Sequence, residues 1–295
     1  MRQEAWLEKH AGTLTGKTVV VTGATGGLGL PICRAVVSLG GKLVTVNRSL
    51  EKSEALAREL KKQWPEADIT CLLADLSRID TVRTVCDRLG RMPVDLLVLN
   101  AGAYAIPRCT CSTGYDNVFT INFLSHYYMV KQLLPLLTRR KGKVIALGSI
   151  AHRYSPTDPD DLDFSTRTRC NLVYGNSKRY LMFALTELMQ HHPEVDFAIA
   201  HPGITFTNIT NHYPPLLFAL IKGPMKIIFM KPASAARAVI QAFSRSIPLG
   251  SWIGPRFFEI WGNPAVSQLR SCPREEQQRI YRTAEKIYGD ILSKE

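Results

Sequence analysis

Short, continuous apolar runs alternate with longer stretches of helical character, and this alternation constrains the fold more than any other feature. The runs are KTVVVTG (17–23), KLVTVNR (42–48), DITCLLADLS (68–77), VDLLVLNAG (94–102), GKVIALGSIAH (142–152) and VDFAIAHPG (195–203). Runs are continuous in this way when helices cover both faces of a sheet. The pattern therefore predicts an α/β fold with a doubly wound parallel sheet.

The rest of the chain fits one domain over residues 1–295. We expect a core over about 15–245, a substrate lid over 205–231 and a C-terminal extension over 246–295. The stretch YPPLLFALIKGPMKIIFMKP (213–232) is apolar and broken by prolines, which favours a lid or a subunit contact and leaves contact with a membrane surface as an alternative. The tail REEQQRIYRTAEKIYGDILSKE (274–295) predicts a polar helix.

Composition excludes several classes of function. The net charge is +12, but the basic residues are dispersed apart from RRKGK (139–143), and no nucleic-acid-binding motif accompanies them. The seven cysteines form no C-x-x-C pair, so we expect free thiols and no metal site. The N-terminus lacks the apolar core of a signal peptide, and no apolar run has the length of a membrane span. We therefore expect a cytoplasmic protein that binds no nucleic acid.

A glycine-rich turn separates the first apolar run from the helical stretch that follows, in VVVTGATGGLGLPICRAV (19–36). Glycines allow backbone amides to approach a pyrophosphate, and a helix N-terminus favours its negative charge. The spacing fits both TGxxxGxG and TGxxGxxG. The turn predicts a nucleotide site made by Gly23, Thr25, Gly26, Gly27, Leu28 and Gly29.

Tyr174 and Lys178 lie four residues apart in NLVYGNSKRY (171–180), a stretch with helical character. Residues at this spacing share one face of a helix. A nearby ammonium favours the phenolate, so we expect the lysine to lower the pKa of the tyrosine. The pair suits a group that must donate or accept a proton.

Taken in order, these motifs resemble the compact oxidoreductase branch of the short-chain dehydrogenase/reductase superfamily over about residues 15–245. The segments AH (151–152), DLDF (161–164) and YGNSK (174–178) resemble its retinol-dehydrogenase-like subgroup. The usual SS and NNAG of that subgroup are GS and LNAG here, which affects the substrate assignment and not the reacting groups. The resemblance implies a Rossmann-type fold and transfer of hydride between a nicotinamide and an apolar carbonyl or alcohol.

The resemblance also implies roles for individual residues. Tyr174 would be the general acid in reduction and the base in oxidation, and Ser149 would bind the substrate oxygen. Lys178 would support the phenol and hold the nicotinamide ribose, and Asn122 would hold a water that links Lys178 to solvent. The further cofactor contacts would be Asp75, Leu76, Asn100, Ala101, Gly102, Pro202, Gly203 and Thr207. We expect His152 to be structural.

The end of the second strand predicts which nicotinamide is used. An NAD-selecting site places an acid there to hold the ribose hydroxyls. Here Asn47 takes that position and Arg48 follows it. An arginine can pair with a 2′-phosphate, so we expect NADP(H) rather than NAD.

Two other hypotheses and one question stay open. A nucleotide-sensing protein could retain this fold without catalysis. A sugar-nucleotide epimerase or dehydratase would need a larger C-terminal domain than the chain offers. The oligomeric state is undecided, and by analogy a homodimer or homotetramer would form through the helices that carry Asn122 and Tyr174.

Overall fold

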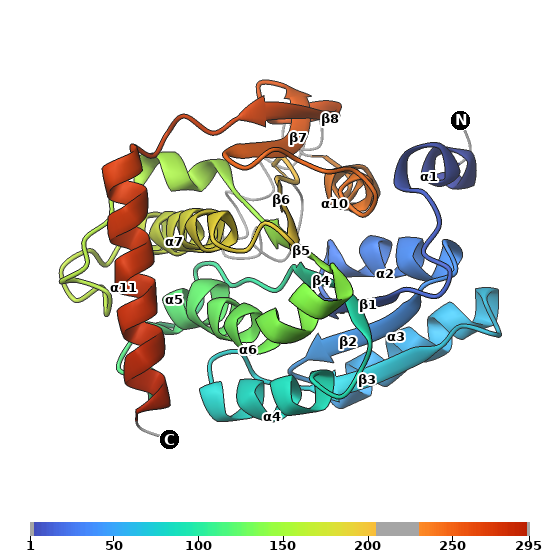
Figure 1. Ribbon diagram of the computed structural model, residues 1–295, viewed down its shortest axis with the longest axis horizontal. Coiled ribbons are helices and arrows are strands. Elements are labelled where there is room, and N and C mark those ends of the chain that lie inside the picture. Colours follow the sequence, from blue (N-terminus) through green and yellow to red (C-terminus); the bar gives the residue numbers. More distant parts are fainter. Residues whose placement is uncertain (1–2, 205–229, 294–295) are drawn as a thin grey trace, which may run out of the picture.

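The computed structural model describes residues 3–204 and 230–293, and its centre is one eight-stranded sheet (Figure 1). The strand order is β3-β2-β1-β4-β5-β6-β7-β8, and all neighbouring pairs are parallel except β7 and β8. The strands are β1 (Thr18–Thr22), β2 (Lys42–Asn47), β3 (Ile69–Leu73), β4 (Val94–Leu99), β5 (Lys143–Leu147), β6 (Asp196–Ala200), β7 (Ser251–Phe257) and β8 (Trp261–Gln268). The predicted doubly wound sheet is confirmed.

The hairpin of β7 and β8 extends the sheet beyond the six strands that the apolar runs predict. The apolar residues of β7 are interrupted by Gly254 and Arg256, and Pro255 faces Pro264 across the hairpin. Its turn places Phe258 and Glu259 at positive φ, 50° and 59°, without a glycine. Such sequences lack the usual signals of a strand and a tight turn, which is why the runs alone did not reveal the hairpin.

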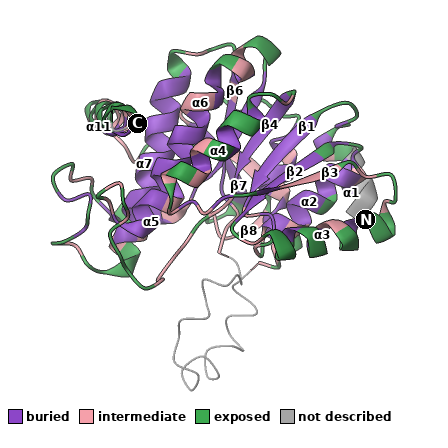
Figure 2. Ribbon diagram, turned by 90° about the horizontal axis from the view of Figure 1, so that it is seen from below, coloured by how far each residue is buried: buried purple, intermediate pink, exposed green. Residues whose placement is uncertain are grey.

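Helices cover both faces of the sheet and make two separate cores. Val19 and Val21 of β1 pack on one side and Val20 packs on the other, because successive side chains in a strand point to opposite faces. The first face carries α1 (Gln3–Ala11), α2 (Gly29–Ser38), α3 (Leu50–Gln63) and α10 (Arg237–Gln241). The second face carries α4 (Ile79–Leu89), α5 (Asn117–Phe119), the π-helical turn η1 (Thr120–Leu124), α6 (Ser125–Arg140), α7 (Cys170–Gln190) and α11 (Arg274–Leu292). Figure 2 shows the sheet and the inner sides of these helices buried.

The C-terminal helix α11 packs across α7 and α6 (Figure 1). It contacts the core through Ile280, Ala284 and Ile287, while much of its other side is exposed, as a polar amphipathic helix requires. The helices that would pair in an oligomer by analogy are thus partly covered by the chain's own tail.

Among residues 3–204 and 230–293, no helix is both long and apolar enough to cross a lipid bilayer. Thr207 and all of the expected lid except residues 230–231 lie outside the described residues. The last described element before residue 205 is β6, and the first helix after residue 229 is the short helix α9 (Pro232–Ala235).

Candidate active site

The glycine turn after β1 is shaped by close backbone contacts. Gly23 has a φ of +65°, and a Cβ on it would lie 2.7 Å from the Cα of Ala101. A Cβ on Gly29 would lie 2.4 Å from the carbonyl oxygens of Gly23 and Ala24. Any side chain at these two positions would force the turn open. The next helix, α2, starts after Leu28 with no side-chain cap. The Leu30 N–H donates to the Gly26 carbonyl and Pro31 has no N–H, so in its first turn the Gly29 N–H remains for a bound anion.

The end of β4 is tied to this turn by a partly buried polar cluster. The Asn100 amide donates to the carbonyl oxygens of Thr22 at 2.8 Å and Gly23 at 2.9 Å. The Thr22 hydroxyl accepts the backbone N–H groups of Asn100 and Ala101, both at 3.0 Å. Two neighbouring strand ends are thereby held in one fixed relation, as a shared ligand surface requires.

Asn122 lies in η1, and π-helical turns inside α-helices are frequent at functional sites. Its amide oxygen accepts the Ala103 N–H at 2.7 Å, and its nitrogen donates to the Ala103 carbonyl and the Ser177 hydroxyl, both at 2.9 Å. A Cβ on Gly102 would lie 3.3 Å from the Asn122 oxygen and 3.8 Å from the Lys178 ammonium nitrogen. The structure therefore brings Gly102, Asn122 and Lys178 together.

Ser149, Tyr174 and Lys178 also meet. Ser149 follows β5; its hydroxyl accepts the Ala151 N–H at 3.2 Å and lies close enough to the phenol on α7 to lower the pKa of Tyr174. Lys178 lies one turn further along α7 and donates from Nζ to the Leu147 carbonyl at 2.9 Å. Its Nζ is 6.0 Å from the centroid of the Tyr174 ring. The two side chains share a helix face, as their spacing predicts.

The pKa values of Tyr174 and Lys178 differ from expectation. The sequence predicts that the lysine lowers the pKa of the tyrosine. Burial raises the pKa of Tyr174 to about 12, and the nearby Ser149 hydroxyl opposes that rise. Burial lowers the pKa of Lys178 to about 8. Nζ points at a backbone carbonyl rather than at the phenol, so desolvation outweighs attraction between the pair. The expected lowering is therefore absent in the protein by itself.

The ends of β2 and β3 complete the carboxyl edge of the sheet. The Asn47 side chain is buried, donates to Ser53 Oγ at 2.8 Å and accepts the Thr25 N–H at 3.3 Å. Arg48, beside it, is exposed. Asp75 follows β3, and its carboxylate accepts the N–H and hydroxyl of Ser77. Leu76 is buried next to it.

These features fit a dinucleotide. The cradle at Gly23 and Gly29 has no room for side chains, and the uncapped start of α2 faces the same strand ends. The family model described as short chain dehydrogenase matches residues 17–215.

The chain belongs to the short-chain dehydrogenase family.

It is an oxidoreductase that acts on CH–OH or C=O groups, and this family binds a nicotinamide cofactor. Retinol dehydrogenase 13 from Homo sapiens is 28% identical over 230 residues, which cover 72% of this chain and 70% of that protein. This relative supports the retinol-dehydrogenase-like subgroup to which the motifs assign the chain.

Two solved structures share the family fold over most of the chain. A crystal structure of an uncharacterised protein from Mycobacterium Paratuberculosis has a TM-score of 0.77 and 25% identity, and the match covers 94% of this chain and 95% of that chain. The complex of Pseudomonas aeruginosa RhlG with NADP has a TM-score of 0.61 and 25% identity, covering 80% of this chain and 92% of that chain.

The end of β6 carries the remaining predicted cofactor residues of the dehydrogenase. Gly203 has a φ of +76°, and a Cβ on it would lie 2.6 Å from the carbonyl oxygen of Ile260 in the hairpin turn. Pro202 precedes it at the carboxyl edge, close to the ends of β5 and β7 in the sheet. Thr207 is the one predicted site residue outside the described part of the chain.

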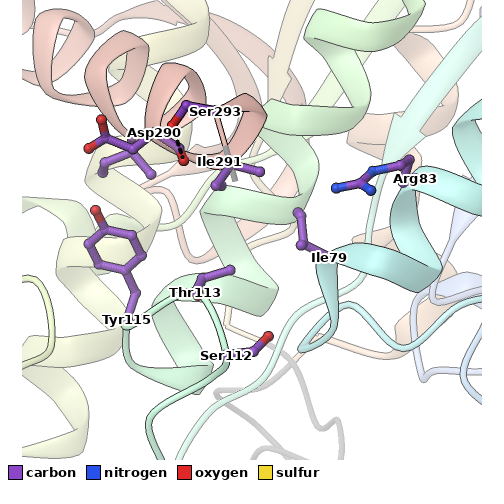
Figure 3. Close-up of a pocket in the computed structure, with 9 residues that line it drawn as sticks. Ile79, Arg83, Ser112, Thr113, Tyr115, Asp290, Ile291 and Ser293 are labelled. Carbon is purple, nitrogen blue, oxygen red and sulfur yellow. Dashed lines mark hydrogen bonds between the residues drawn. The ribbon is translucent and has the colours of Figure 1, made fainter. Parts of the chain in front are cut away.

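A separate cavity of about 320 Å³ lies between α4, the 112–115 loop and the end of α11 (Figure 3). Ile79 and Tyr115 line it together with Asp290. Of the dehydrogenase motif residues that lie in the described part of the chain, none lines this cavity. It is therefore distinct from the candidate active site.

Several residues around the site were not predicted from the motifs. Tyr104 packs its ring edge-on against Tyr174, with centroids 5.2 Å apart. A Cβ on Gly175 would lie 2.5 Å from the carbonyl oxygen of Ala151, so this glycine lets α7 approach the 3₁₀ helix η2 (Ile150–Tyr154). The small residue directly after the tyrosine was the available signal, because close backbone approach requires glycine.

The loop between η2 and α7 is organised around a buried aspartate. Asp161 is buried and accepts hydrogen bonds from Thr166 and from Arg167, the latter at 2.8 Å. The guanidinium of Arg167 in turn lies over the ring of Phe164. The aspartate orders the loop, because a buried carboxylate requires such partners.

Proposed function

We propose that the protein is an NADP(H)-dependent oxidoreductase that interconverts an apolar carbonyl compound and its alcohol, with Tyr174 as the general acid and base. The observation that carries the proposal is the convergence of Ser149, Tyr174 and Lys178 beside Gly102. A bound nicotinamide would supply or take up the hydride. It would be held by the glycine turn, by Asn100 and by Lys178.

In reduction, Tyr174 gives its proton to the substrate oxygen. A pKa of about 12 keeps the phenol protonated at neutral pH, which suits a proton donor. Ser149 donates a hydrogen bond to the same oxygen as negative charge develops there. In the direction of oxidation, the raised pKa leaves little phenolate at neutral pH to act as the base, and a nearby positive charge would increase that fraction.

After reduction, Lys178 and Asn122 would restore the proton that Tyr174 has given to the substrate. Lys178 has a pKa of about 8, so it stays mostly protonated at neutral pH and yet releases a proton more readily than an ordinary lysine. Four partner atoms, from Ala103, Ser177 and His126, form hydrogen bonds with Asn122. These bonds hold Asn122 close to Gly102, which in turn lies close to Lys178. We propose that Asn122 holds the water through which Lys178 exchanges protons with solvent.

Aromatic side chains beside the phenol support an apolar substrate. Tyr104 contacts one edge of the Tyr174 ring. Tyr154, close enough to raise the pKa of Tyr174, is 53% exposed. A polar substrate would lose hydrogen bonds to water when it packs against these tyrosine rings, whereas an apolar substrate gains free energy when its surface is buried there.

Fluorescence titration with NADPH and, separately, NADH tests the cofactor, and NADPH consumption with a panel of apolar aldehydes and ketones tests the reaction. We expect tighter binding of NADPH and turnover of at least one carbonyl. Binding without any turnover across the panel would favour the nucleotide-sensing alternative. Failure to bind either nucleotide, in folded protein, would overturn the proposed function.

A further inference from the structure

We propose that His152 is a positioning residue which, through Arg179, Ser271 and Glu276, holds Ser149 in place for the reaction. The inference rests on the proposed function, because it assumes that Ser149 binds the substrate oxygen. It also gives the C-terminal segment a role, since Ser271 and Glu276 lie beyond the stretch 17–215 that matches the family model. We call these four residues the C-terminal brace.

His152 joins the serine to the tail with both ring nitrogens. Its side chain is fully buried, Nδ1 lies 2.5 Å from the Ser149 carbonyl oxygen, and Nε2 lies 2.6 Å from Ser271 Oγ. A carbonyl oxygen can only accept, so Nδ1 carries a proton. Burial lowers the pKa of the ring to about 4, so at neutral pH Nε2 is unprotonated and accepts the Ser271 hydroxyl. The neutral ring thus uses both of its hydrogen-bonding positions.

Arg179 holds the other side of the same segment. Its guanidinium is nearly buried and donates to the carbonyl oxygens of His152 and Ser271, both at 2.9 Å. It also forms two hydrogen bonds, at 2.8 and 2.6 Å, with the carboxylate of Glu276 in the first turn of α11. Arg179 directly follows Lys178 on α7, so the tail is connected to the helix that carries the reacting groups.

The segment after Ser149 needs such an anchor. It is a 3₁₀ helix of five residues, and short 3₁₀ helices have poor hydrogen-bond geometry of their own. The Ser149 hydroxyl must nevertheless keep a fixed distance from Tyr174 to act on one oxygen. A displacement of about 1 Å in a reacting constellation can cost on the order of 100-fold in rate. The C-terminal brace supplies the contacts that η2 lacks.

Two histidine variants separate the contacts. In His152→Asn, the amide nitrogen occupies nearly the place of Nδ1 and can still donate to the Ser149 carbonyl. In His152→Phe, the ring shape remains and both hydrogen bonds are lost. We expect kcat to fall roughly 10- to 100-fold in His152→Phe, with little change in the Kd for NADPH. His152→Asn, which keeps the Ser149 contact and loses the Ser271 contact, should recover only part of the loss.

A pair of glutamates on α11 provides matched controls. Glu276 binds Arg179, whereas Glu285 binds Tyr127 and Lys131 on α6, away from η2. Both changes to glutamine remove one ion pair between α11 and the core. Glu276→Gln should lower kcat several-fold and leave the KM for NADPH unchanged. Glu285→Gln should leave both values near wild type while lowering thermal stability to a similar extent.

Amide hydrogen exchange over residues 149–155 gives a readout that needs no turnover. Exchange should accelerate in His152→Phe and Glu276→Gln, to a smaller extent in His152→Asn, and not in Glu285→Gln. Equal exchange in Glu276→Gln and Glu285→Gln, or an unchanged kcat in His152→Phe, would overturn the inference. If the wild type turned over no carbonyl but exchange followed the expected pattern, the brace would stand and the proposed function would fail.

The pH profile distinguishes positioning from proton transfer. His152→Asn should lower the rate by the same factor at every pH between about 6 and 9, because a neutral, buried ring transfers no proton in that range. Loss of a limb of the profile in this variant would mean that the histidine takes part in the chemistry, and the positioning role would be wrong.

Discussion

Two buried histidines, His126 and His152, occupy equivalent positions on the two sides of the active site. Nδ1 of His126 lies 3.1 Å from the carbonyl oxygen of Asn122, and Nδ1 of His152 lies 2.5 Å from that of Ser149. Each ring also meets a hydroxyl at Nε2, from Thr22 in the first case and from Ser271 in the second. The same pair of contacts, one to a backbone carbonyl and one to a hydroxyl, thus holds two of the proposed catalytic residues, Asn122 and Ser149.

The difference lies in what supports each hydroxyl. Thr22 is a fully buried residue of β1, inside the sheet and inside the family match. Ser271 is partly exposed, lies between β8 and α11, and is beyond that match. The cofactor side of the site is therefore fixed by the sheet itself, and the reaction side depends on a tail that folds back over it. Each side should respond to its own set of changes.

The largest expected effect is on turnover alone. Tyr174→Phe removes the hydroxyl that donates the proton and keeps the ring that packs on Tyr104. We expect turnover to fall on the order of 1000-fold, within the range for loss of a general acid, with the Kd for NADPH nearly unchanged. Steady-state rates and fluorescence titration measure the two quantities. Retained turnover would mean that another group is the acid.

The second prediction concerns Gly29→Ala in the glycine turn, which should affect cofactor binding. Gly29→Ala places a Cβ 2.4 Å from two carbonyl oxygens, so the turn must open. We expect the Kd for NADPH to rise on the order of 100-fold, because the amides leave their positions. Gly289→Ala on α11, where a Cβ meets nothing within 4 Å, is the control and should bind like wild type. Equal binding by both variants would contradict a phosphate cradle at this turn.

Acid should weaken both sides of the site through the two histidines. Burial lowers the pKa of each ring to about 4 from its ordinary value near 6.5. Between these values the unfolded chain binds more protons, so stability that is present above pH 6.5 is lost as the pH falls toward 4. The full loss is on the order of 3 kcal/mol for each histidine.

Urea midpoints at pH 7, 6 and 5 check this dependence. His126→Asn and His152→Asn should each make the decline between pH 6.5 and 4 shallower than in the wild type, whatever their stability at pH 7. A decline as steep as that of the wild type in either variant would show that the ring titrates normally in the folded protein.

The sequence was informative where backbone geometry is required and uninformative where side chains from distant segments meet. The strands β1 to β6, the turn at Gly23 and Gly29, and the pairing of Tyr174 with Lys178 all follow from local patterns. The contacts of Ser271 and Glu276 join segments about 100 residues apart, and no spacing rule encodes them. The hairpin of β7 and β8 is local, but its sequence lacks the usual signals of a strand and a tight turn. The pKa of Tyr174 also could not be predicted, because it depends on burial that only the folded chain defines.

The smallest expected effect concerns the choice of cofactor at the end of β2. Arg48 is exposed, and within residues 3–204 and 230–293 no acidic side chain pairs with it, so its guanidinium is available to a phosphate. Asn47 is engaged with Thr25 and Ser53, and it carries no charge that would repel a 2′-phosphate. Arg48→Ala should therefore weaken NADPH binding about tenfold, with NADH binding unchanged, because a charge-assisted hydrogen bond is worth roughly 1.5–3 kcal/mol and exposure to water reduces it.

Arg58→Ala controls for the loss of one positive charge. Arg58 is exposed on α3 and lies 4.0 Å from Glu54, so its loss lowers the net charge without touching the end of β2. Titrations of both variants at low and high salt should show a weaker salt dependence of NADPH binding in Arg48→Ala only. If Arg48→Ala weakened NADPH and NADH equally, the arginine would act on the shared part of the two cofactors. Selection would then have to come from Asn47 alone, by the absence of an acid rather than by attraction.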